Sequence, residues 1–370
     1  MAGIYIHVPF CKSFCNYCTF CRTTDSSLIN DYIDALYLEM SRCQCNEPIE
    51  TIYIGGGTPS SIGLNALNKI LTNISSLFDI SHVKEFTVEC NPEDMTTQLS
   101  EMLLRGNVNR VSMGVQSLND DVLKAMNRRH NSDKVIEAID ILRNVGITNI
   151  SVDFIYGLPE HLTYAFEKDL ERFVALNVPH LSAYSLSYEE GALFYNQLAK
   201  GEIKELDDDL VFQQYNLLTQ RLQQAGYCHY EISNYALNGQ HSQHNSSYWN
   251  RVPYFGFGPA ACSYFNEKRI SNTYDIRRYI EAQKNQSLYY ETEILTNDDV
   301  FNEIIMLKLR TKEGVNLSSI SQLDKKYTAH FLKNVKTFID DGSVLHIDDN
   351  YRINEKSWFS SNYIISRLFV

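Results

Sequence analysis

The sequence lacks the features that mark membrane and secreted proteins. No apolar run approaches the roughly 18 residues that span a bilayer, and the N-terminus leads into a strand-like run rather than a signal peptide. A basic excess is also absent: 33 Lys and Arg stand against 45 Asp and Glu, and the net charge of −12 repels nucleic acid phosphates and anionic lipid heads. We therefore expect a cytoplasmic protein with no nucleic-acid partner and at most peripheral membrane association.

The cysteines do not form the even, regularly spaced set of a secreted disulfide framework. There are nine, and beyond the N-terminal group they are scattered along the chain. We assign no role to Cys21, Cys43 or Cys45, and free or buried thiols are expected there. The sequence also has no Pro-rich linker, low-complexity tract or short repeat that would mark a domain boundary or a solenoid.

Three cysteines stand close together near the N-terminus: Cys11, Cys15 and Cys18, at C-x3-C-x2-C spacing directly after the strand-like run Ile4–Val8. Three thiolates on one loop can hold three irons of a cubane [4Fe–4S] cluster and leave the fourth iron open for a ligand. A zinc site would need a fourth Cys or His and usually has paired C-x2-C units, while a disulfide is out of place in a cytosolic chain. The spacing therefore favours an iron–sulfur cluster.

Short β-rich runs alternate with amphipathic stretches of helical period in the first half of the chain, a pattern typical of parallel βα units. Helices are predicted, for example, at Leu28–Cys43 and Ser132–Val145. This succession of units predicts an incomplete, TIM-like (β/α)6 barrel in the α/β class. The six predicted strands are Gly3–Val8, Thr51–Gly55, Val83–Cys90, Arg110–Gln116, Thr148–Ile155 and His180–Ser187.

The alternation stops near residue 190, and the length of 370 residues allows about two domains. We expect residues 1–190 to form the barrel core and residues 191–290 to extend it, as a helical stretch followed by an aromatic-rich irregular region. Residues 291–370 read as a small C-terminal domain of winged-helix type. Its predicted elements are helices Asp298–Leu309, Leu317–Lys325 and His330–Asp340 and a hairpin of Val344–Ile347 and Tyr351–Ile353.

Polar residues recur where the predicted strands end, which is where a parallel barrel places its ligand site. The second strand leads into Gly55–Thr58, whose glycines can bring backbone N–H groups close to a ligand. Glu89, Gln116 and Asp153 lie at the ends of the next three strands. Each alone could belong to an ordinary turn or helix cap, but their recurrence at one edge predicts a polar ligand site.

Several segments together resemble the oxygen-independent coproporphyrinogen III oxidase group of radical S-adenosylmethionine (SAM) proteins. The resemblance implies a radical SAM barrel, in which the open iron of a [4Fe–4S] cluster on the three cysteines chelates SAM and an electron from the cluster cleaves it to a 5′-deoxyadenosyl radical. It also implies an electron donor such as flavodoxin or ferredoxin. The matching segments are Tyr5–Cys11, Cys15–Cys18, Gly55–Pro59, Gly114–Gln116, Asp153–Pro159 and Glu303–Gly314.

The same resemblance implies a set of SAM-binding residues but no catalytic residue. Arg128 matches a position that reaches the SAM carboxylate, a task for which its fixed guanidinium fork is suited, and the alternative for Arg128 is a solvated helix end. The full implied set is Tyr5, Tyr17, Gly56, Gly57, Thr58, Glu89, Gln116, Arg128 and Asp153.

Two departures point to one branch of this group. The oxidases carry another cysteine two residues after the third ligand, where this chain has Phe20, and a long N-terminal arm, where it has ten residues before Cys11. Both departures match the heme-chaperone (HemW-like) branch, whose members are thought to bind heme and pass it to hemoproteins. His244–Trp249 matches the H-N-x-x-Y-W motif of that branch. His244 would then ligate heme iron, while Tyr248 and Trp249 would offer flat faces to the porphyrin.

The resemblance therefore predicts a heme chaperone that binds heme or porphyrin in residues 191–290 and passes it to acceptor hemoproteins, which the sequence does not identify. His241, His229 and His7 are alternatives to His244 as the iron ligand. On the same scaffold, an oxidase would decarboxylate coproporphyrinogen III to protoporphyrinogen IX, and a radical SAM methyltransferase would act on heme. We expect the oxidase activity to be absent. The sequence leaves open whether SAM cleavage is part of the cycle.

Overall fold

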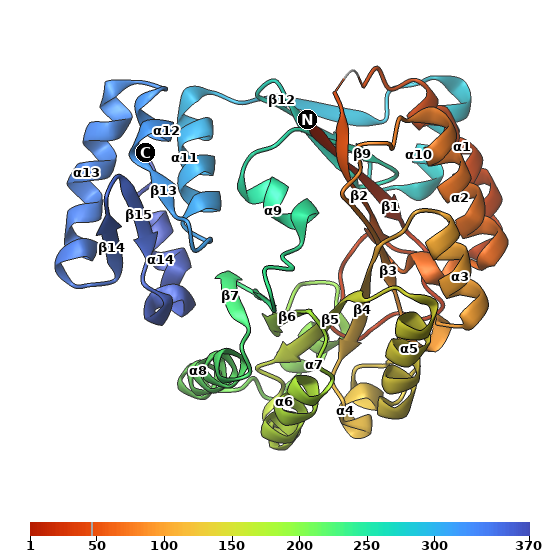
Figure 1. Ribbon diagram of the computed structural model, residues 1–370, viewed down its shortest axis with the longest axis horizontal. Coiled ribbons are helices and arrows are strands. Elements are labelled where there is room, and N and C mark those ends of the chain that lie inside the picture. The colour runs from red at the N-terminus through yellow and green to blue at the C-terminus, as the bar shows by residue number, and fades with distance from the viewer. Residues whose placement is uncertain (46) are drawn as a thin grey trace.

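A mixed sheet of 12 strands forms the centre of the molecule in the computed structural model, which describes residues 1–45 and 47–370. The strand order is β12-β11-β10-β9-β1-β2-β3-β4-β5-β6-β8-β7 (Figure 1). Strands β1 to β6 run parallel to one another, and the strands at both outer edges pair antiparallel. The parallel strands are β1 (Ala2–Val8), β2 (Ile49–Gly56), β3 (Glu85–Cys90), β4 (Arg110–Gln116), β5 (Asn149–Tyr156) and β6 (His180–Ser185).

The six strands predicted from the sequence are all confirmed. Strand β4 has the predicted bounds, and the other five differ by at most two residues at either end. Helices pack against the outer face of these strands (Figure 1), which buries the strands on both sides and accounts for their almost continuous apolar runs. These helices are α1 (Ile29–Ser41), α2 (Leu64–Leu77), α3 (Thr97–Arg105), α4 (Asp120–Ala125), α5 (Ser132–Val145) and α6 (Phe166–Ala175).

The bounds of α5 show how local sequence sets these helices. The side chain of Asn131 accepts a hydrogen bond from the Lys134 N–H at the start of the helix, and Gly146 ends it in the left-handed conformation, with φ of 102°. Val135 and Leu142, two turns apart, are both fully buried against the sheet. The predicted helix Leu28–Cys43 is confirmed as α1 with slightly shorter bounds.

The region after residue 190 is more regular than predicted, since the segment expected to be irregular contains several strands. Among them, β9 pairs in parallel with β1, so the incomplete barrel has a seventh parallel strand. Strands of three to five residues carry too little alternation for periodicity to reveal them. The elements are α7 (Leu193–Ala199), α8 (Asp208–Gln224), β7 (Cys228–Glu231), β8 (Asn234–Ala236), α9 (Gln243–Trp249), β9 (Tyr254–Phe257), β10 (Cys262–Phe265), β11 (Lys268–Asn272), α10 (Ile276–Asn285) and β12 (Tyr290–Ile294).

The C-terminal domain combines helices with a small sheet in the order β13-β15-β14. The predicted hairpin is confirmed, but the helix expected at Leu317–Lys325 ends at Ser321. The next helix starts at Lys325 rather than His330, because Asp324 caps it by accepting from the Lys326 N–H. The elements are α11 (Asn297–Lys308), β13 (Val315–Asn316), α12 (Leu317–Ser321), α13 (Lys325–Asp340), β14 (Val344–Ile347), β15 (Asn350–Ile353) and α14 (Ser361–Ser366).

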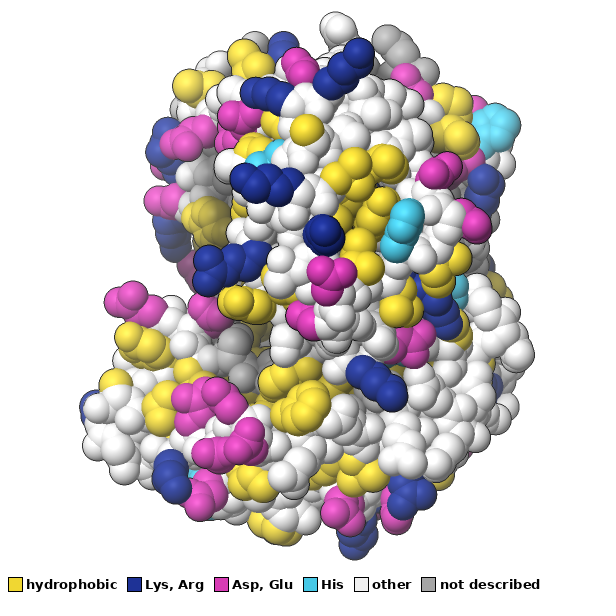
Figure 2. Space-filling model, turned by 90° about the vertical axis from the view of Figure 1, so that its left-hand side faces the viewer, with side chains coloured by type: hydrophobic (Ala, Val, Ile, Leu, Met, Phe, Trp, Pro, Cys, Tyr) yellow, Lys and Arg dark blue, Asp and Glu magenta, His cyan; other side chains and the backbone are white. Residues whose placement is uncertain are grey.

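Backbone hydrogen bonds join this domain to the edge of the large sheet. The Ile232 N–H donates to the Arg310 carbonyl over 2.9 Å, and the Lys312 N–H donates to the Tyr230 carbonyl over 3.0 Å. Figure 2 views the molecule from the side of this domain and shows charges of both signs interspersed, with a band of hydrophobic side chains between them. None of the helices in the described part of the chain combines the length and hydrophobicity that a membrane crossing requires.

A buried carboxylate joins α1 to the far edge of the sheet. Glu39 on α1 accepts hydrogen bonds from the Gly258 N–H over 2.8 Å, the Asn272 side chain over 2.8 Å, the Tyr279 hydroxyl over 2.5 Å and the Tyr289 hydroxyl over 3.2 Å. Burial raises the pKa of Glu39 to about 7. The four donors come from the segments around β9, β11 and α10, so one side chain positions this entire edge.

Replacing Glu39 by Ala should lower the free energy of unfolding by about 3 kcal/mol or more, because several buried donors lose their acceptor at once. Urea titration followed by circular dichroism would measure this. The matched control is Asp31→Ala on the same helix: Asp31 is exposed, pairs with Lys284 over 2.8 Å, and should contribute less than about 1 kcal/mol. Equal losses in the two variants would show that the Glu39 contacts do not hold this edge.

Candidate functional site

A cleft of about 890 Å³ opens at the carboxyl ends of the parallel strands. The loop between β1 and α1, the turn after β2 and the ends of β3, β4 and β5 line it. The structure therefore brings together the three cysteines and most residues of the implied SAM site, whereas Tyr5 and His244 lie elsewhere. The predicted residues in the lining are Cys11, Cys15, Tyr17, Cys18, Gly56, Gly57, Thr58, Glu89, Gln116, Arg128 and Asp153.

The loop that carries the cysteines is closed at its base by backbone hydrogen bonds. The Cys11 N–H donates to the Thr23 carbonyl over 2.9 Å, and the Thr23 N–H donates to the Pro9 carbonyl over 2.7 Å. Burial raises the pKa of the Cys11 thiol to about 11 and also raises the pKa of Cys18. Both thiols are thus protonated at neutral pH in the metal-free protein, and binding iron through thiolates releases protons.

The spacing of the cysteines fits a cluster better than a single ion. Among residues 1–45 and 47–370, no three or more Cys, His, Asp or Glu side chains converge so as to hold one metal ion. A mononuclear zinc site requires such convergence at about 2.3 Å from each sulfur. In a cubane each thiolate binds a different iron, so the sulfur atoms lie further apart. The donor set of this loop therefore fits a [4Fe–4S] cluster.

The glycine turn after β2 has a different role from the one predicted. Its N–H groups do not face a ligand: the Gly57 N–H donates to the Val8 carbonyl over 2.9 Å, and the Thr58 N–H donates to the Phe10 carbonyl over 2.8 Å. A Cβ on Gly57 would lie 2.8 Å from the Phe10 carbonyl oxygen. The glycine is needed because the cysteine loop packs directly on this turn. With its N–H groups used, the turn offers the cleft oxygen acceptors, the carbonyls and the Thr58 hydroxyl oxygen, which suit the amino group of SAM rather than its carboxylate.

Two buried carboxyl groups face the cleft. Glu89 accepts from the Tyr53 hydroxyl over 2.7 Å and from the Gly56 N–H over 3.1 Å. Burial raises the pKa of Glu89 to about 7, with a further contribution from the negative charge of Asp153, and burial raises the pKa of Asp153 to about 6. A cationic ligand group between them would favour their ionised forms. The pair therefore suits the positively charged parts of SAM.

Arg128 is not the solvated helix end that the sequence left as an alternative. Its guanidinium is held in the cleft wall, where Nη1 lies 3.3 Å from Cys15 Sγ and Nη2 donates to Asn91 Oδ1 over 2.7 Å and to the Gly114 carbonyl over 2.5 Å. Its Nε is buried without a hydrogen-bond partner. This unpaired donor and the fixed positive charge fit an anionic group, such as a cluster thiolate or the SAM carboxylate.

The end of β4 has an unusual backbone that serves the cleft. Gln116 adopts φ of 72°, a left-handed conformation that is rare for residues other than glycine, next to a register shift between β4 and β5. A Cβ on Gly114 would lie 3.2 Å from Gln116 Nε2 and 3.4 Å from Arg128 Nη2. Gly114 thus leaves room for both side chains over the strand. Backbone strain of this kind is often found at ligand sites.

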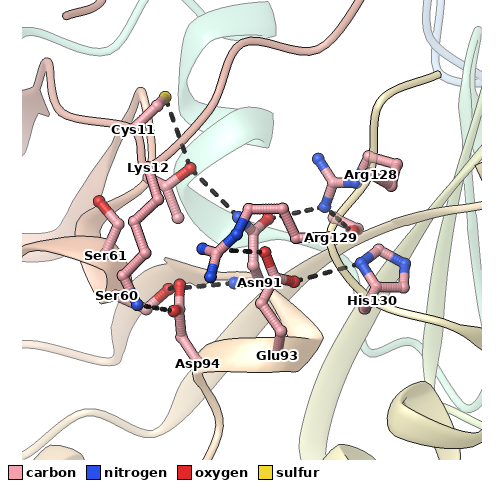
Figure 3. A network of polar contacts seen from close by, with 12 residues as sticks. Cys11, Lys12, Ser60, Ser61, Asn91, Glu93, Asp94, Arg128, Arg129 and His130 are labelled. Atoms are coloured by element: carbon pink, nitrogen blue, oxygen red, sulfur yellow. Dashed lines mark hydrogen bonds and ion pairs between the residues drawn. The ribbon is translucent and has the colours of Figure 1, made fainter. Parts of the chain in front are cut away.

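The sequence analysis missed a polar network at the mouth of the cleft (Figure 3). Asn91 joins Arg128 to Thr58, with Asn91 Nδ2 3.4 Å from Thr58 Oγ1. Lys12 on the cysteine loop pairs with the buried Asp94 over 2.6 Å and so ties this loop to the segment after β3. The signal was present, because Asn91 to Asp94 directly follow a strand end in the same way as the predicted residues.

Tyr5 is not among the residues that line the cleft, and its contact with SAM stays a prediction. Its hydroxyl lies 3.0 Å from Nδ1 of His7, and its ring lines a second cavity. The other ring nitrogen of His7 donates to the Cys21 carbonyl over 2.9 Å. Tyr5 and His7 therefore brace the base of the cysteine loop.

His244 is placed as a structural residue, and this arrangement does not support its predicted role as the heme ligand. It is only 1% exposed, with Nδ1 2.8 Å from Thr51 Oγ1 and Nε2 2.8 Å from the Tyr248 hydroxyl. Burial lowers the pKa of His244 to about 3, so the ring is neutral. Both nitrogens are already occupied, and iron could bind only if Thr51 or Tyr248 moved away.

The H-N-x-x-Y-W segment instead anchors α9 inside the barrel. The Glu85 carboxylate accepts from the N–H groups of Gln243 over 2.8 Å and His244 over 2.9 Å, so a strand side chain caps this helix. The His244 ring stacks on Tyr53 with centroids 5.3 Å apart. Among the alternative ligands, His229 is buried beside Trp358, and His241 is half-buried and stacked on Tyr230.

Two family models match the chain. The radical SAM superfamily model matches residues 5–172, and the HemN C-terminal domain model matches residues 295–359. Among solved structures, the fold is similar to that of coproporphyrinogen III oxidase (HemN) from Escherichia coli, a radical SAM enzyme. The TM-score is 0.86 at 21% identity, over 100% of this chain and 90% of that one. This likeness establishes the shared fold.

Proteins of similar sequence show to which branch of the radical SAM proteins the chain belongs. The chain is 33% identical over 356 residues to the heme chaperone HemW of Lactococcus lactis, a match that covers 93% of both chains. It is 34% identical over 322 residues to the heme chaperone HemW of Bacillus subtilis, which covers 85% of both. The heme-chaperone branch predicted from Phe20 and the short arm is therefore confirmed. The chain belongs to the HemW family of radical SAM proteins.

Proposed function

We propose that this chain is a heme chaperone that holds a [4Fe–4S] cluster on Cys11, Cys15 and Cys18, binds SAM in the adjoining cleft and passes heme to acceptor hemoproteins. The observation that carries the proposal is the convergence of three cysteines on a cleft whose polar lining comes from the ends of consecutive strands. The heme chaperones among its relatives, which match almost the whole chain, support the assignment of cargo.

The residues of the cleft account for the binding of both groups. When bound, the cluster supplies the electron that can cleave the sulfonium of SAM. Arg128 places a positive charge beside Cys15, with Nη1 3.3 Å from Sγ. Glu89 and Asp153 supply carboxylates for the cationic groups of SAM, and the glycine turn supplies carbonyl acceptors. The proposal includes an electron donor such as flavodoxin or ferredoxin, because a cluster that gives up electrons must be reduced again. It also includes a cytoplasmic location.

The cleft also supports the choice of a chaperone over an oxidase. Phe20, at the position where the oxidases carry a further cysteine, lines the cleft with 68% of its surface exposed. Cys21 does not replace the missing thiol, since its Sγ donates to the Tyr274 carbonyl over 3.2 Å and it is not part of the lining. The cleft therefore presents a bulky apolar ring where the oxidases present a thiol.

Replacing Cys11, Cys15 or Cys18 by Ala should abolish the [4Fe–4S] absorption of anaerobically reconstituted protein, because each removes one of three iron ligands. The matched control is Cys21→Ala on the same loop, which should keep the full absorption. Iron and sulfide analysis would give the same answer independently. Loss of the cluster in Cys21→Ala, or its retention in any of the other three variants, would mean that the ligands are wrongly assigned.

Asp153→Asn should weaken SAM binding about ten-fold or more without loss of iron, since a hydrogen bond to a charged group contributes about 1.5–3 kcal/mol. Binding to the natural chain should also tighten from about pH 5 to about pH 8. In this interval Asp153 and Glu89, whose pKa values are raised to about 6 and about 7, become ionised and attract the cationic ligand. Isothermal titration with SAM would measure both effects.

The exposed Asp133→Asn on α5 is the control for this titration and should bind SAM normally. Gly57→Val is not a clean probe of SAM binding, because its side chain would push the cysteine loop off the turn and disturb the cluster as well. Normal SAM affinity in Asp153→Asn at all pH values would remove Asp153 from the proposed site.

The reconstituted protein should not decarboxylate coproporphyrinogen III at a measurable rate, since Phe20 replaces the oxidase's additional cysteine. It should bind about one heme per chain, a stoichiometry inferred from the family. Release of CO2 and formation of deoxyadenosine would be followed with coproporphyrinogen III, and the Soret band would be followed with heme. Turnover to protoporphyrinogen IX would overturn the chaperone assignment in favour of the oxidase.

A further inference from the structure

A second cavity, of about 860 Å³, opens on the inner side of the strands β9 to β11, where α9 of the barrel meets α11 of the C-terminal domain. Figure 1 shows α9 in the centre of the molecule, with α11 of the C-terminal domain beside it. The walls are mainly aromatic and aliphatic, and they come from Tyr5, Tyr248, Tyr254, Tyr264, Met306 and Leu307. The cleft that holds the three cysteines shares none of these residues.

We propose that this second cavity is where heme binds, with the thiol of Cys262 as the donor to iron and Arg251 and Arg269 as the partners of the propionates. The proposal rests on the proposed function of the chain as a heme chaperone and assigns its cargo site. It replaces the prediction that His244 is the iron ligand.

The shape and chemistry of the walls suit a flat, apolar ring system. Tyr248 and Tyr254 meet edge to face, with centroids 4.6 Å apart and an interplanar angle of 79°, and Tyr254 continues to Tyr264 with centroids 6.3 Å apart. Aromatic side chains of this kind offer apolar surfaces for dispersion and stacking contacts with a porphyrin. Met306 and Leu307 on α11 close the opposite wall.

The cavity lining contains two arginines, Arg251 and Arg269, and one glutamate, Glu303. Arg251 and Arg269 both contact the carboxylate of Glu303, so two cations share one half-buried anion. Their other partners, Glu267 and Glu293, are more than half exposed, and ion pairs at such positions contribute little. A propionate can therefore replace either exposed glutamate at small cost. Bidentate pairing of carboxylates is what guanidinium groups do best.

The wall of the cavity contains a side chain that can bind iron. Cys262 at the start of β10 lines the cavity, and its Sγ lies 3.5 Å from the polar Oγ of Ser271. Cysteine thiolate is one of the established axial ligands of heme iron. His244 is not among the lining residues, and its Nε2 lies 2.8 Å from the hydroxyl of Tyr248, which is one of them. His244 is accordingly a positioning residue for Tyr248.

A cavity of similar size provides the contrast. It measures about 870 Å³ and lies between α8 and the C-terminal domain, but its lining is mainly amide, hydroxyl and charged side chains such as Asn216, Gln220 and Glu355. Burying an apolar porphyrin against such a polar lining would contribute little favourable free energy. The two cavities thus supply matched positions for testing the proposal.

The test is a heme titration of the full chain followed by absorbance, with two pairs of variants. Leu307→Trp fills the proposed cavity, and Leu345→Trp fills the polar one. Cys262→Ser removes the proposed donor, and Cys228→Ser removes a thiol outside the cavity. We expect Leu307→Trp and Cys262→Ser to bind heme at least about ten-fold more weakly, and Leu345→Trp and Cys228→Ser to bind as the natural chain does. The [4Fe–4S] absorption and thermal unfolding of each variant verify that it is folded.

Two further readouts separate the roles. The ferrous carbon monoxide complex should show the red-shifted Soret band of a thiolate-ligated heme, and Cys262→Ser should lose it. Arg269→Gln should weaken binding of heme but not of its dimethyl ester, in which the carboxylates carry no charge. A merely structural arginine would affect both ligands equally.

The outcomes distinguish the cavity from the function. If the natural chain binds heme and Leu307→Trp, Cys262→Ser and Arg269→Gln all bind it equally well, the cavity assignment is overturned while the chaperone proposal stands. If the natural chain binds no heme at all, the proposed function falls and this inference falls with it. Weakened binding in Leu307→Trp together with an unchanged spectrum in Cys262→Ser would overturn Cys262 as the iron ligand.

Discussion

The close backbone contact between the end of β1 and the glycine turn after β2 is the constraint on which the site depends. Peptide groups on Gly57 and Thr58 bond directly to the carbonyls of Val8 and Phe10, which a side chain on Gly57 would prevent. These hydrogen bonds hold the cysteine loop against the carboxyl-terminal edge of the parallel strands. Rigid support of this kind is what metal ligands need if they are to be held ready for a cluster.

Polar groups inside the barrel serve two separate purposes. Near the carboxyl ends of the strands, Glu89 and Asp153 face the cleft and are available to a ligand. Nearer the amino ends, Glu85 caps α9, and Arg110 contacts the buried side chains of Thr87 and His180. The same inward-facing rows of the sheet thus provide a binding layer and a structural layer. This separation explains why Glu85 is structural while Glu89, four residues further along β3, faces the cleft.

The strands, and the loop that brings three cysteines to the cleft, could be predicted from the sequence because both depend on local patterns. Alternating runs located β1 to β6, and the spacing of the cysteines located the loop. The features that the sequence analysis did not predict depend on contacts between distant segments of the chain. The pairing of β9 with β1 joins residues about 250 positions apart, and neither its short length nor its aromatic composition indicates a partner.

The sequence likewise does not show which partner an individual polar group faces. A glycine triplet shows that backbone can come close to something, but the sequence does not say whether that neighbour is a ligand or, as here, the loop at Phe10. His244 was assigned to iron for the same reason: a motif names the residue but not the two hydrogen-bond partners that already occupy its ring. Asn91 was overlooked although it stands at a strand end, since its role depends on the placement of Arg128.

The stacked contact between the rings of Tyr53 and His244 has a thermodynamic consequence. Tyr53 holds Glu89 in the cleft, and His244 holds Tyr248 at the second cavity, so one continuous set of contacts touches both. A ligand in the cleft that shifts Glu89 would alter the free energy of binding in the cavity, and the effect must be equal in the reverse direction. In such a molecule, loading of cargo and occupancy of the SAM site would report on each other without any large movement of domains.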